Sequence, residues 1–262
     1  MTPFISSINY CPVKSVSFQK IDSCEIRKNI GIIGDRIFAF SKNLELEKVR
    51  LFEKDPEFRK GKWNNILTLK NSPFLNKYNF SYIKNKLTLF IGNEEILTID
   101  VNEIGQSDQL SKKMLELENS LEKPLFLMKN EDNPFFDTAI SNKTVLPHSI
   151  SLLNIKSIKD FQDKIGKKIE HSIFRGNICV DGMEPWVEQN LIGKVIKINN
   201  ISFKVEKKIP RCVAINLKPG SDDNSLNLLQ LLKKTYNHFD MGIYLTALEN
   251  GKINIGDKIL NK

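Results

Sequence analysis

The chain contains only three histidines and four cysteines in 262 residues. The histidines stand at positions 148, 171 and 238, a spacing that does not suit a zinc site. The cysteines, at 11, 24, 179 and 212, form no CxxC pair, which argues against a zinc ribbon or a thioredoxin-like motif. Their wide separation does not suggest a disulfide framework either, so a reduced, cytoplasmic setting is the simplest interpretation.

Long hydrophobic runs are also missing. No segment has 18 consecutive apolar residues, so no membrane-spanning helix is expected. Residues 1–10 contain no basic region followed by an apolar stretch, which argues against secretion. The nucleotide-binding patterns GxGxxG and GxxxxGK(S/T) are absent, and so is the GxSxG turn of many hydrolases. The sequence therefore contains no motif that would predict nucleotide binding or serine hydrolysis.

The charge is basic but not clustered. The formal net charge is +8, yet the lysines are spread along the whole chain and form no block of five like charges. No recognisable RNA- or DNA-binding motif accompanies them, so nucleic acid is not an expected partner. We interpret most of the lysines as solvated surface and a few cations as candidates for a phosphorylated-ligand site.

Hydrophobic periodicity predicts an α+β fold. The first 100 residues are mainly β, with alternating strands expected at 5–13, 23–27, 36–40, 80–83, 86–91 and 95–101. A helix is predicted over 106–121, because Leu110, Met114 and Leu117 recur at three- and four-residue steps. Residues 131–144 are polar and are the best candidate for a domain boundary or an active-site loop.

The second half mixes strands and helices. Strands are expected at 149–153, 177–180, 195–198, 203–207, 243–248 and 258–260, and helices at 157–169 and 225–236. Many short strands with few helices favour a β-barrel-centred fold over a doubly wound sheet.

One cysteine lies next to a residue that could make its side chain reactive. Cys212 directly follows Arg211, and an adjacent guanidinium favours the thiolate, the form that attacks or binds a soft metal. The alternative is that a lone cysteine is a small buried hydrophobe. We interpret Cys11, Cys24 and Cys179 as structural.

Two further motifs carry cations. Pro12-Val13-Lys14-Ser15 and Gly34-Asp35-Arg36 combine an ammonium, a hydroxyl and a planar guanidinium, which suit a phosphate and a heterocycle. Phe174-Arg175-Gly176-Asn177 is read as part of a strand, which would place Arg175 and Asn177 on one face. Structure alone would also explain each motif, as a turn beside a strand or as an arginine paired with Glu184.

The order and spacing of these motifs resemble the MOSC domain of molybdenum cofactor sulfurases and mitochondrial amidoxime-reducing proteins. The resemblance implies a MOSC N-terminal β-barrel-like domain at 1–104 and a MOSC domain at 105–262, without a pyridoxal-phosphate or iron–sulfur domain. It implies that Cys212 ligates molybdenum and is the catalytic residue. It also implies that a molybdenum cofactor (Mo-molybdopterin) is contacted by Lys14, Ser15, Arg36, Pro147, His148, Arg175, Asn177, Arg211 and Tyr244.

The same resemblance implies an oxidoreductase that reduces N-hydroxylated or N-oxide compounds. Electrons would come from a separate protein of flavodoxin, ferredoxin or cytochrome type. The alternative is a sulfur or cofactor carrier in which Cys212 accepts a persulfide from a cysteine desulfurase. The chain departs from the family after the cysteine, where Leu217–Asp223 replaces an Asp-Pro-x-Thr-Gly turn.

The motifs also make a geometric prediction. Lys14, Ser15 and Arg36 come from the first half of the chain, whereas Arg175 and Cys212 come from the second. If all of them contact one cofactor, they must converge in a cleft between the two halves.

Overall fold

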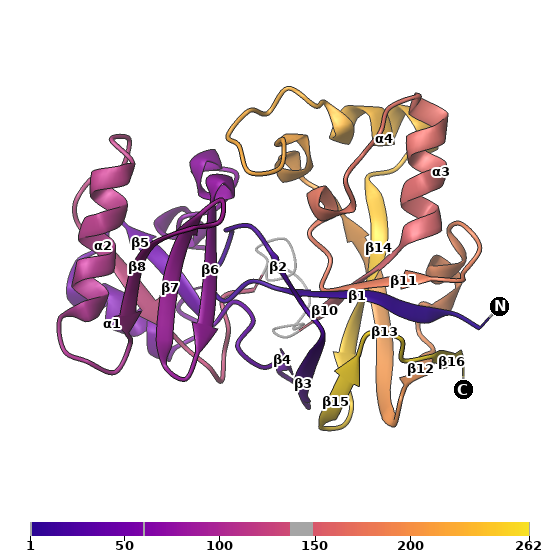
Figure 1. The fold of residues 1–262 in the computed structure, drawn as a ribbon, viewed down its shortest axis with the longest axis horizontal. Coiled ribbons are helices and arrows are strands. Elements are labelled where there is room, and N and C mark those ends of the chain that lie inside the picture. Colours follow the sequence, from indigo (N-terminus) through magenta and orange to yellow (C-terminus); the bar gives the residue numbers. More distant parts are fainter. Residues whose placement is uncertain (1, 60, 137–148, 262) are drawn as a thin grey trace.

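The structure is a computed structural model that describes residues 2–59, 61–136 and 149–261. Two lobes are visible in Figure 1, one built on a large sheet with helices α3 and α4 and one containing α1 and α2. Both ends of the chain lie on the first of these lobes, which we call the large-sheet lobe, and the other is the helical lobe. The fold is mixed, with mostly sheet structure, as the sequence predicts.

The largest sheet has eight strands and contains both ends of the chain. Its order is β16-β12-β13-β14-β10-β11-β1-β2. The strands are β1 (Phe4–Tyr10), β2 (Gln19–Ile21), β10 (Ile150–Asn154), β11 (Ile178–Asp181), β12 (Val195–Ile198), β13 (Ile201–Pro210), β14 (Asp240–Ala247) and β16 (Ile259–Asn261). Among the described strands of this sheet, only β10 and β11 pair in parallel. Because β1 pairs with β11, the N-terminal strand belongs to the same sheet as the C-terminal half.

A closed barrel is not found in the part of the chain that the structure describes. The sheet curls instead, and one isolated antiparallel bridge joins Phe4 to Lys258 next to β16. The Ile5 amide donates to the Asp257 carbonyl at 2.9 Å, and the Ile259 amide donates to the Pro3 carbonyl at 2.8 Å. The predicted barrel is therefore replaced by an eight-stranded sheet in which a few hydrogen bonds link the start of β1 to the start of β16.

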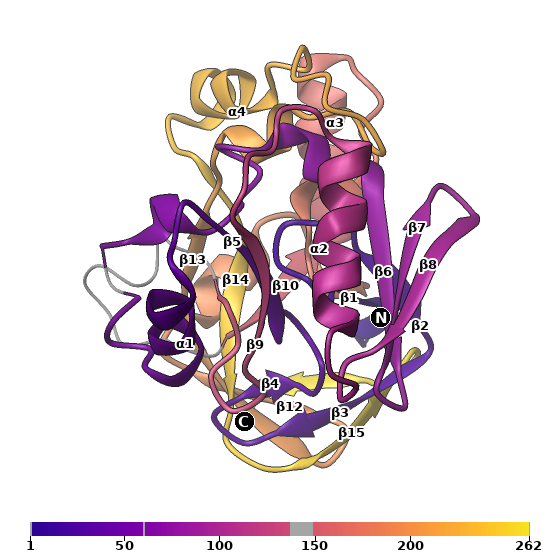
Figure 2. The same ribbon diagram turned by 90° about the vertical axis from the view of Figure 1, so that its left-hand side faces the viewer.

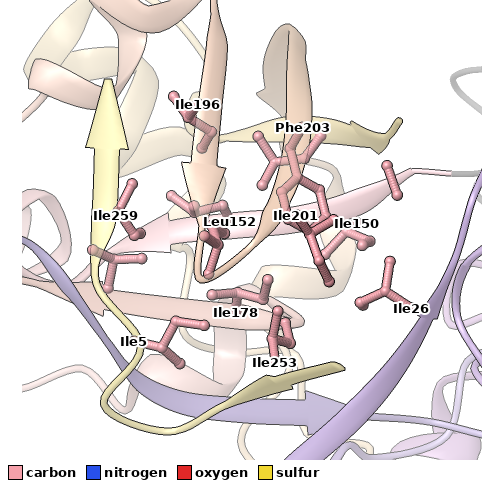
Figure 3. Close-up of a cluster of buried hydrophobic side chains, with 14 of the residues drawn as sticks. Ile5, Ile26, Ile150, Leu152, Ile178, Ile196, Ile201, Phe203, Ile253 and Ile259 are labelled. Carbon is pink, nitrogen blue, oxygen red and sulfur yellow. The ribbon is translucent and has the colours of Figure 1, made fainter. Parts of the chain in front are cut away.

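The concave side of this sheet holds an isoleucine-rich core. Figure 3 shows side chains from β1, β10, β11, β12, β13 and β16 pointing toward one another. A small sheet, β15 (Gly251–Asn254), β3 (Ser23–Arg27) and β4 (Gly31–Ile32), adds Ile26 and Ile253 to the same core. β-Branched side chains suit strands because they pack closely on a pleated surface.

The helical lobe is built on two smaller sheets. One pairs β5 (Phe38–Lys42) with β9 (Leu125–Lys129), and the other is the meander β6 (Tyr78–Ile83), β7 (Lys86–Ile91) and β8 (Glu94–Asp100). Figure 2 shows α2 (Gln106–Leu117) between the two sheets. The predicted helix over 106–121 is confirmed as far as Leu117, and its Leu110 and Met114 are buried. Helix α1 (Leu46–Lys54) has no counterpart in the sequence prediction.

The remaining helices cover one side of the large sheet. Helix α3 (Ile155–Ile165) begins two residues before its predicted start and stops at Gly166, which has a left-handed backbone. The Asn154 side chain caps it by accepting the Lys156 amide. Helix α4 (Leu228–Tyr236) is shorter than the predicted 225–236. No helix in the described ranges is long and apolar enough to cross a membrane.

Strand pairing divides the chain differently from a cut after residue 104. Strands β1–β4 join the large-sheet lobe, because β1 pairs with β11 and β3 pairs with β15. Residues 106–129 belong to the helical lobe, because β9 pairs with β5. The chain therefore enters the large-sheet lobe, passes through the helical lobe and returns.

Candidate functional site

Most of the sequence-predicted site residues line one cavity. This central cavity, of about 380 Å³, receives side chains from both lobes. The predicted residues among its lining are Lys14, Ser15, Arg36, Arg175, Arg211, Cys212 and Tyr244. The predicted convergence of the two halves is therefore seen in the fold.

Three of these residues have an unusual backbone. Ser15, Arg36 and Arg175 have φ angles of 70°, 55° and 49°. These values lie in the left-handed region, which residues other than glycine and asparagine seldom adopt. Ser15 lies in the turn between β1 and β2, Arg36 lies two residues before β5, and Arg175 follows a short helix that ends at Phe174. Such conformations cost about 1–3 kcal/mol each and tend to occur at functional sites. Their gathering around one cavity points to a site whose side chains are held in place.

Arg36 is fixed by an ion pair, an amide and an aromatic ring. Its guanidinium donates to Asp35 Oδ2, with Nε at 2.8 Å, and its Nη2 donates to Asn177 Oδ1 at 2.9 Å. Its Cζ lies 3.9 Å from the centre of the Phe136 ring and 5.8 Å from that of Phe18. The ring contacts and the buried Asp35 carboxylate hold the guanidinium at the cavity wall.

Asn177 lies behind Arg36 and is not among the residues that line the cavity. It is fully buried, and its Nδ2 donates to the Asn9 carbonyl at 3.2 Å and to Asp35 Oδ2 at 3.1 Å. Its Oδ1 also accepts the amide and hydroxyl of Ser151, at 3.1 and 2.8 Å. The side chain therefore joins β1, β10 and the Asp35–Arg36 pair into one buried network.

The prediction that Arg175 and Asn177 share a strand face is wrong. Residues His171–Phe174 form the 3-10 helix η4, Arg175 is its left-handed C-cap, and β11 begins only at Ile178. Gly176 allows this path, because a Cβ there would lie 2.4 Å from the Leu153 side chain. The turn, rather than a strand, aims Arg175 at the cavity.

Arg175 lies close to a second guanidinium. Its Nη2 donates to the Val16 carbonyl at 2.8 Å, and its Cζ lies 4.8 Å from the centre of the Phe18 ring. Burial lowers the pKa of Arg175, and the positive charge of Arg36 adds to this effect. Phe18 contacts both arginines, and so an aromatic ring is shared by two like charges. The alternative pairing with Glu184 is not found, because Glu184 pairs with Lys156.

Lys14 also lines the cavity. Its side chain is only 7% exposed, and its Nζ donates to the Phe136 carbonyl at 2.7 Å. This hydrogen bond satisfies a buried polar group and fixes the position of the lysine side chain at the cavity wall. Ser15 follows it at the wall.

Arg211 anchors the cysteine loop. Its guanidinium donates to the Met241 carbonyl, with Nε at 2.9 Å, and to the Phe174 carbonyl at 2.7 Å. Gly242 packs beside it: its φ is +81°, and a Cβ there would lie 3.4 Å from Arg211 Nη2 and 2.4 Å from the Leu152 carbonyl oxygen. The arginine thereby ties β13 to β14 and to the turn that bears Arg175.

Cys212 is the exposed cysteine of the chain. It is the N-cap of the 3-10 helix η6 (Val213–Asn216) and lines the central cavity. The interpretation of Cys11, Cys24 and Cys179 as structural agrees with their burial. Burial raises the pKa of Cys11 to about 11 and that of Cys24 to about 12, and both thiols are therefore protonated at neutral pH. Over the described residues, no group of three or more His, Cys, Asp and Glu could hold a metal.

The last predicted residues have different outcomes. Tyr244 is 5% exposed on β14 and packs with Phe136 and Ile209 beside the cavity. Pro147 and His148 lie outside the described residues. His238, which the sequence did not place in the site, stacks on Tyr236 with ring centres 5.7 Å apart and does not line the cavity.

Sequence reasoning missed several residues of the site. Phe18 and Phe136 contact the guanidinium groups, and Ser151 fixes Asn177. The turn that contains Thr68 and Lys70 forms part of the wall. No local pattern marks these positions, because their role depends on contacts between distant segments.

Residues 144–260 match the family model described as the MOSC domain. A search of curated protein sequences found no match. The solved structure of the YuaD protein from Bacillus subtilis is similar at 12% identity and a TM-score of 0.44, over 99% of this chain and 94% of that one.

Two YiiM structures are similar over a smaller part. YiiM from Geobacillus stearothermophilus has 14% identity and a TM-score of 0.35, over 43% of this chain and 53% of its own. YiiM from Escherichia coli has 12% identity and a TM-score of 0.34, over the same shares of 43% and 53%. At such low identities and TM-scores these likenesses carry no functional information.

Proposed function

Residues 144–260 of the chain match the MOSC domain model, and on this premise we propose that the protein binds a molybdenum cofactor and acts as an oxidoreductase. The observation that carries the proposal is the central cavity. It combines an exposed thiol at Cys212 with fixed cations at Lys14, Arg36 and Arg175. The resemblance of the motifs to molybdenum cofactor proteins supports the same choice.

The donor set fits such a cofactor. Cys212 offers a single soft sulfur ligand, and the described residues offer no protein cluster that would complete a metal site. A metal here would therefore need a group that brings its own ligands. The cations Lys14, Arg36 and Arg175 suit a phosphate, and the planar rings of Phe18 and Phe136 lie beside two of them.

The proposed reaction is the two-electron reduction of N-hydroxylated or N-oxide compounds. The cofactor, when bound, supplies the two-electron redox chemistry. Two electrons and two protons cleave the N–O bond of an N-hydroxy group, which leaves the N–H compound and water. In this proposal Cys212 would ligate the metal, and Arg36 and Arg175 would hold the anionic part of the cofactor. Because the side chains of Arg36 and Arg175 are already fixed by contacts within the protein, they do not need to rearrange during the reaction.

The electrons would come from a separate donor of flavodoxin, ferredoxin or cytochrome type. We place the protein in the cytoplasm, since its buried cysteines are free thiols. We also propose two functional units that share the site. One comprises the residues before the MOSC match, including Ser15, Arg36 and the helical lobe, and the other is the MOSC domain with Arg175 and Cys212.

Metal content tests the cofactor proposal. Protein purified from a molybdenum-replete host is expected to carry near-stoichiometric molybdenum and to release a fluorescent pterin on oxidation. Cys212→Ser is expected to change the metal's spectrum, whereas Cys24→Ser, at a buried cysteine outside the cavity, is the matched control. Metal-free protein from a host with an intact cofactor pathway would contradict the proposal.

Turnover tests the reaction separately. Loaded protein with an artificial reductant is expected to reduce benzamidoxime or hydroxylaminopurine. A loaded protein that turns over neither compound would end the reductase proposal but leave the cofactor site intact.

The exposure of Cys212 also favours a second candidate, a sulfur or cofactor carrier. Incubation with a cysteine desulfurase and cysteine, followed by mass spectrometry, distinguishes the two. A gain of one sulfur atom confined to Cys212 supports the carrier. No gain, together with amidoxime reduction, supports the reductase.

A further inference from the structure

One side of the central cavity is formed by the helical lobe. Asn64, Thr68, Leu69 and Lys70 line it, and none of the motifs in the sequence includes them. Cys212 lines the same cavity from the large-sheet lobe. Residues 64–70 therefore contribute to the site without belonging to the matched region 144–260.

The turn that bears Lys70 is held rigidly. The Thr68 amide donates to Asn71 Oδ1 at 2.8 Å, and Asn71 Nδ2 donates to the Ile66 carbonyl at 3.0 Å. The Ser72 amide donates to the Thr68 carbonyl at 2.7 Å. Leu69 is only 6% exposed and packs into the core of the helical lobe. The backbone at Lys70 is thus fixed from both sides, while its side chain is exposed.

The described lining of the cavity has five basic side chains and no acidic one. Four of the five are already bonded within the protein: Lys14 to Phe136, Arg36 to Asp35 and Asn177, Arg175 to Val16, and Arg211 to Phe174 and Met241. Lys70 differs, because none of the hydrogen bonds or ion pairs within the described ranges involves its ammonium group. Its charge is available to a ligand in the cavity.

We propose that Lys70 determines substrate specificity by pairing with an anionic group, such as a carboxylate, on the compound that is reduced. The inference rests on the proposed reductase function and names its substrate class: N-hydroxylated compounds that also carry a negative charge. A lysine suits this task because its flexible stem lets one ammonium follow anions of different position. A cation with no competing protein acceptor gains most from such a pair.

The test compares a neutral and an anionic ligand that differ in one group. Benzamidoxime and 4-carboxybenzamidoxime are titrated calorimetrically into loaded, oxidised protein without reductant, so that binding is measured without turnover. The carboxylate is expected to tighten binding about three- to fivefold at low salt, and this preference is expected to shrink as salt is added. Lys70→Gln is expected to remove most of the preference and Lys70→Arg to keep it.

Lys84→Gln is the matched control, since Lys84 is an exposed lysine in the β6–β7 turn and does not line the cavity. It is expected to keep the full preference. Equal binding of the two ligands, or a preference that survives Lys70→Gln, overturns the inference. Loss of molybdenum from Lys70→Gln also overturns it, because Lys70 would then hold the cofactor. Failure of the loaded protein to reduce either ligand counts against the reductase function instead.

Discussion

The Arg36 Nη2 atom donates to Asn177 Oδ1 at 2.9 Å, across 141 positions of sequence. The same Asn177 side chain donates to Asp35 Oδ2 at 3.1 Å. Two motifs that are far apart in the sequence therefore form one hydrogen-bonded unit at the wall of the central cavity. The contact also explains how a buried amide outside the cavity controls a guanidinium inside it.

Removal of the Asn177 side chain is expected to loosen this unit. Asn177→Ala leaves the Ser151 hydroxyl and Asp35 with fewer partners in a buried place. A loss of about 2–4 kcal/mol in unfolding free energy is expected, with weaker retention of molybdenum. Urea denaturation and metal analysis measure the two effects. Asn93→Ala, at an exposed turn, is the control, and equal behaviour of the two variants would contradict the network.

Gly242 is expected to tolerate no side chain. In Gly242→Ala, the new Cβ would meet the Leu152 carbonyl at 2.4 Å with φ at +81°. Repulsion and backbone strain together predict a loss of roughly 3 kcal/mol or more in unfolding free energy. Gly220→Ala is the matched control, because its φ is +67° but nothing lies within 4 Å of its Cβ. It is expected to lose only about 1 kcal/mol. Similar losses in the two variants would show that the close contact does not matter.

Phe18 is expected to support anion binding through the two arginines that it contacts. Phe18→Leu removes both cation–π contacts and is expected to weaken the binding of inorganic phosphate to cofactor-free protein about two- to fivefold. Phe18→Tyr is expected to restore the affinity. Phe58→Leu is the control, since the Phe58 ring lies 3.2 Å from the Lys62 ammonium and does not line the cavity. Unchanged phosphate affinity in Phe18→Leu, measured by calorimetry, would refute this role.

The buried thiols predict a loss of stability at high pH. Burial raises the pKa of Cys11 from 9.0 to about 11, so the folded protein retains a proton that the unfolded chain releases. The stabilising contribution is present below pH 9 and is lost as the pH rises through 11, with a slope of about 1.4 kcal/mol per pH unit. Cys11→Ser keeps a hydroxyl donor for the Val13 carbonyl and does not titrate.

The difference in unfolding free energy between the wild type and Cys11→Ser is therefore expected to shrink between pH 9 and 11. Urea denaturation at several pH values measures it, and parallel curves would contradict the assignment.

In the native wild type at pH 8, iodoacetamide is expected to label Cys212 well before the three buried cysteines.

Much of the local structure could be predicted from the sequence. The helix that contains Leu110 and Met114 has a clear three- and four-residue period, and the β6–β8 meander alternates between turns at Asn85 and Gly92. Both signals come from residues close in sequence, where one face of an element must be apolar to pack. Helix α1 was missed because a nine-residue, largely charged segment gives little such signal.

The motifs of the site can also be recognised in the sequence, because Arg211-Cys212 and Phe174-Arg175-Gly176-Asn177 are short combinations of chemically distinctive residues. The backbone conformation of these motifs cannot be predicted in the same way. A strand was predicted for Arg175 because periodicity cannot indicate a left-handed turn when the residue there is an arginine. The burial of Leu153 against Gly176 decided that path, and this contact depends on the packing of β10.

The sequence by itself determined which side chains were available: one cysteine beside an arginine, and cations in three separated motifs. Only the tertiary structure decided which of them meet. Pairing of β1 with β11 brings the segment around Lys14 and Ser15 to Arg175, and the returning chain places Lys70 in the same cavity wall. Such contacts arise because strands that are distant in sequence are buried against one another. The free energy of that packing cannot be predicted from any local pattern of residues.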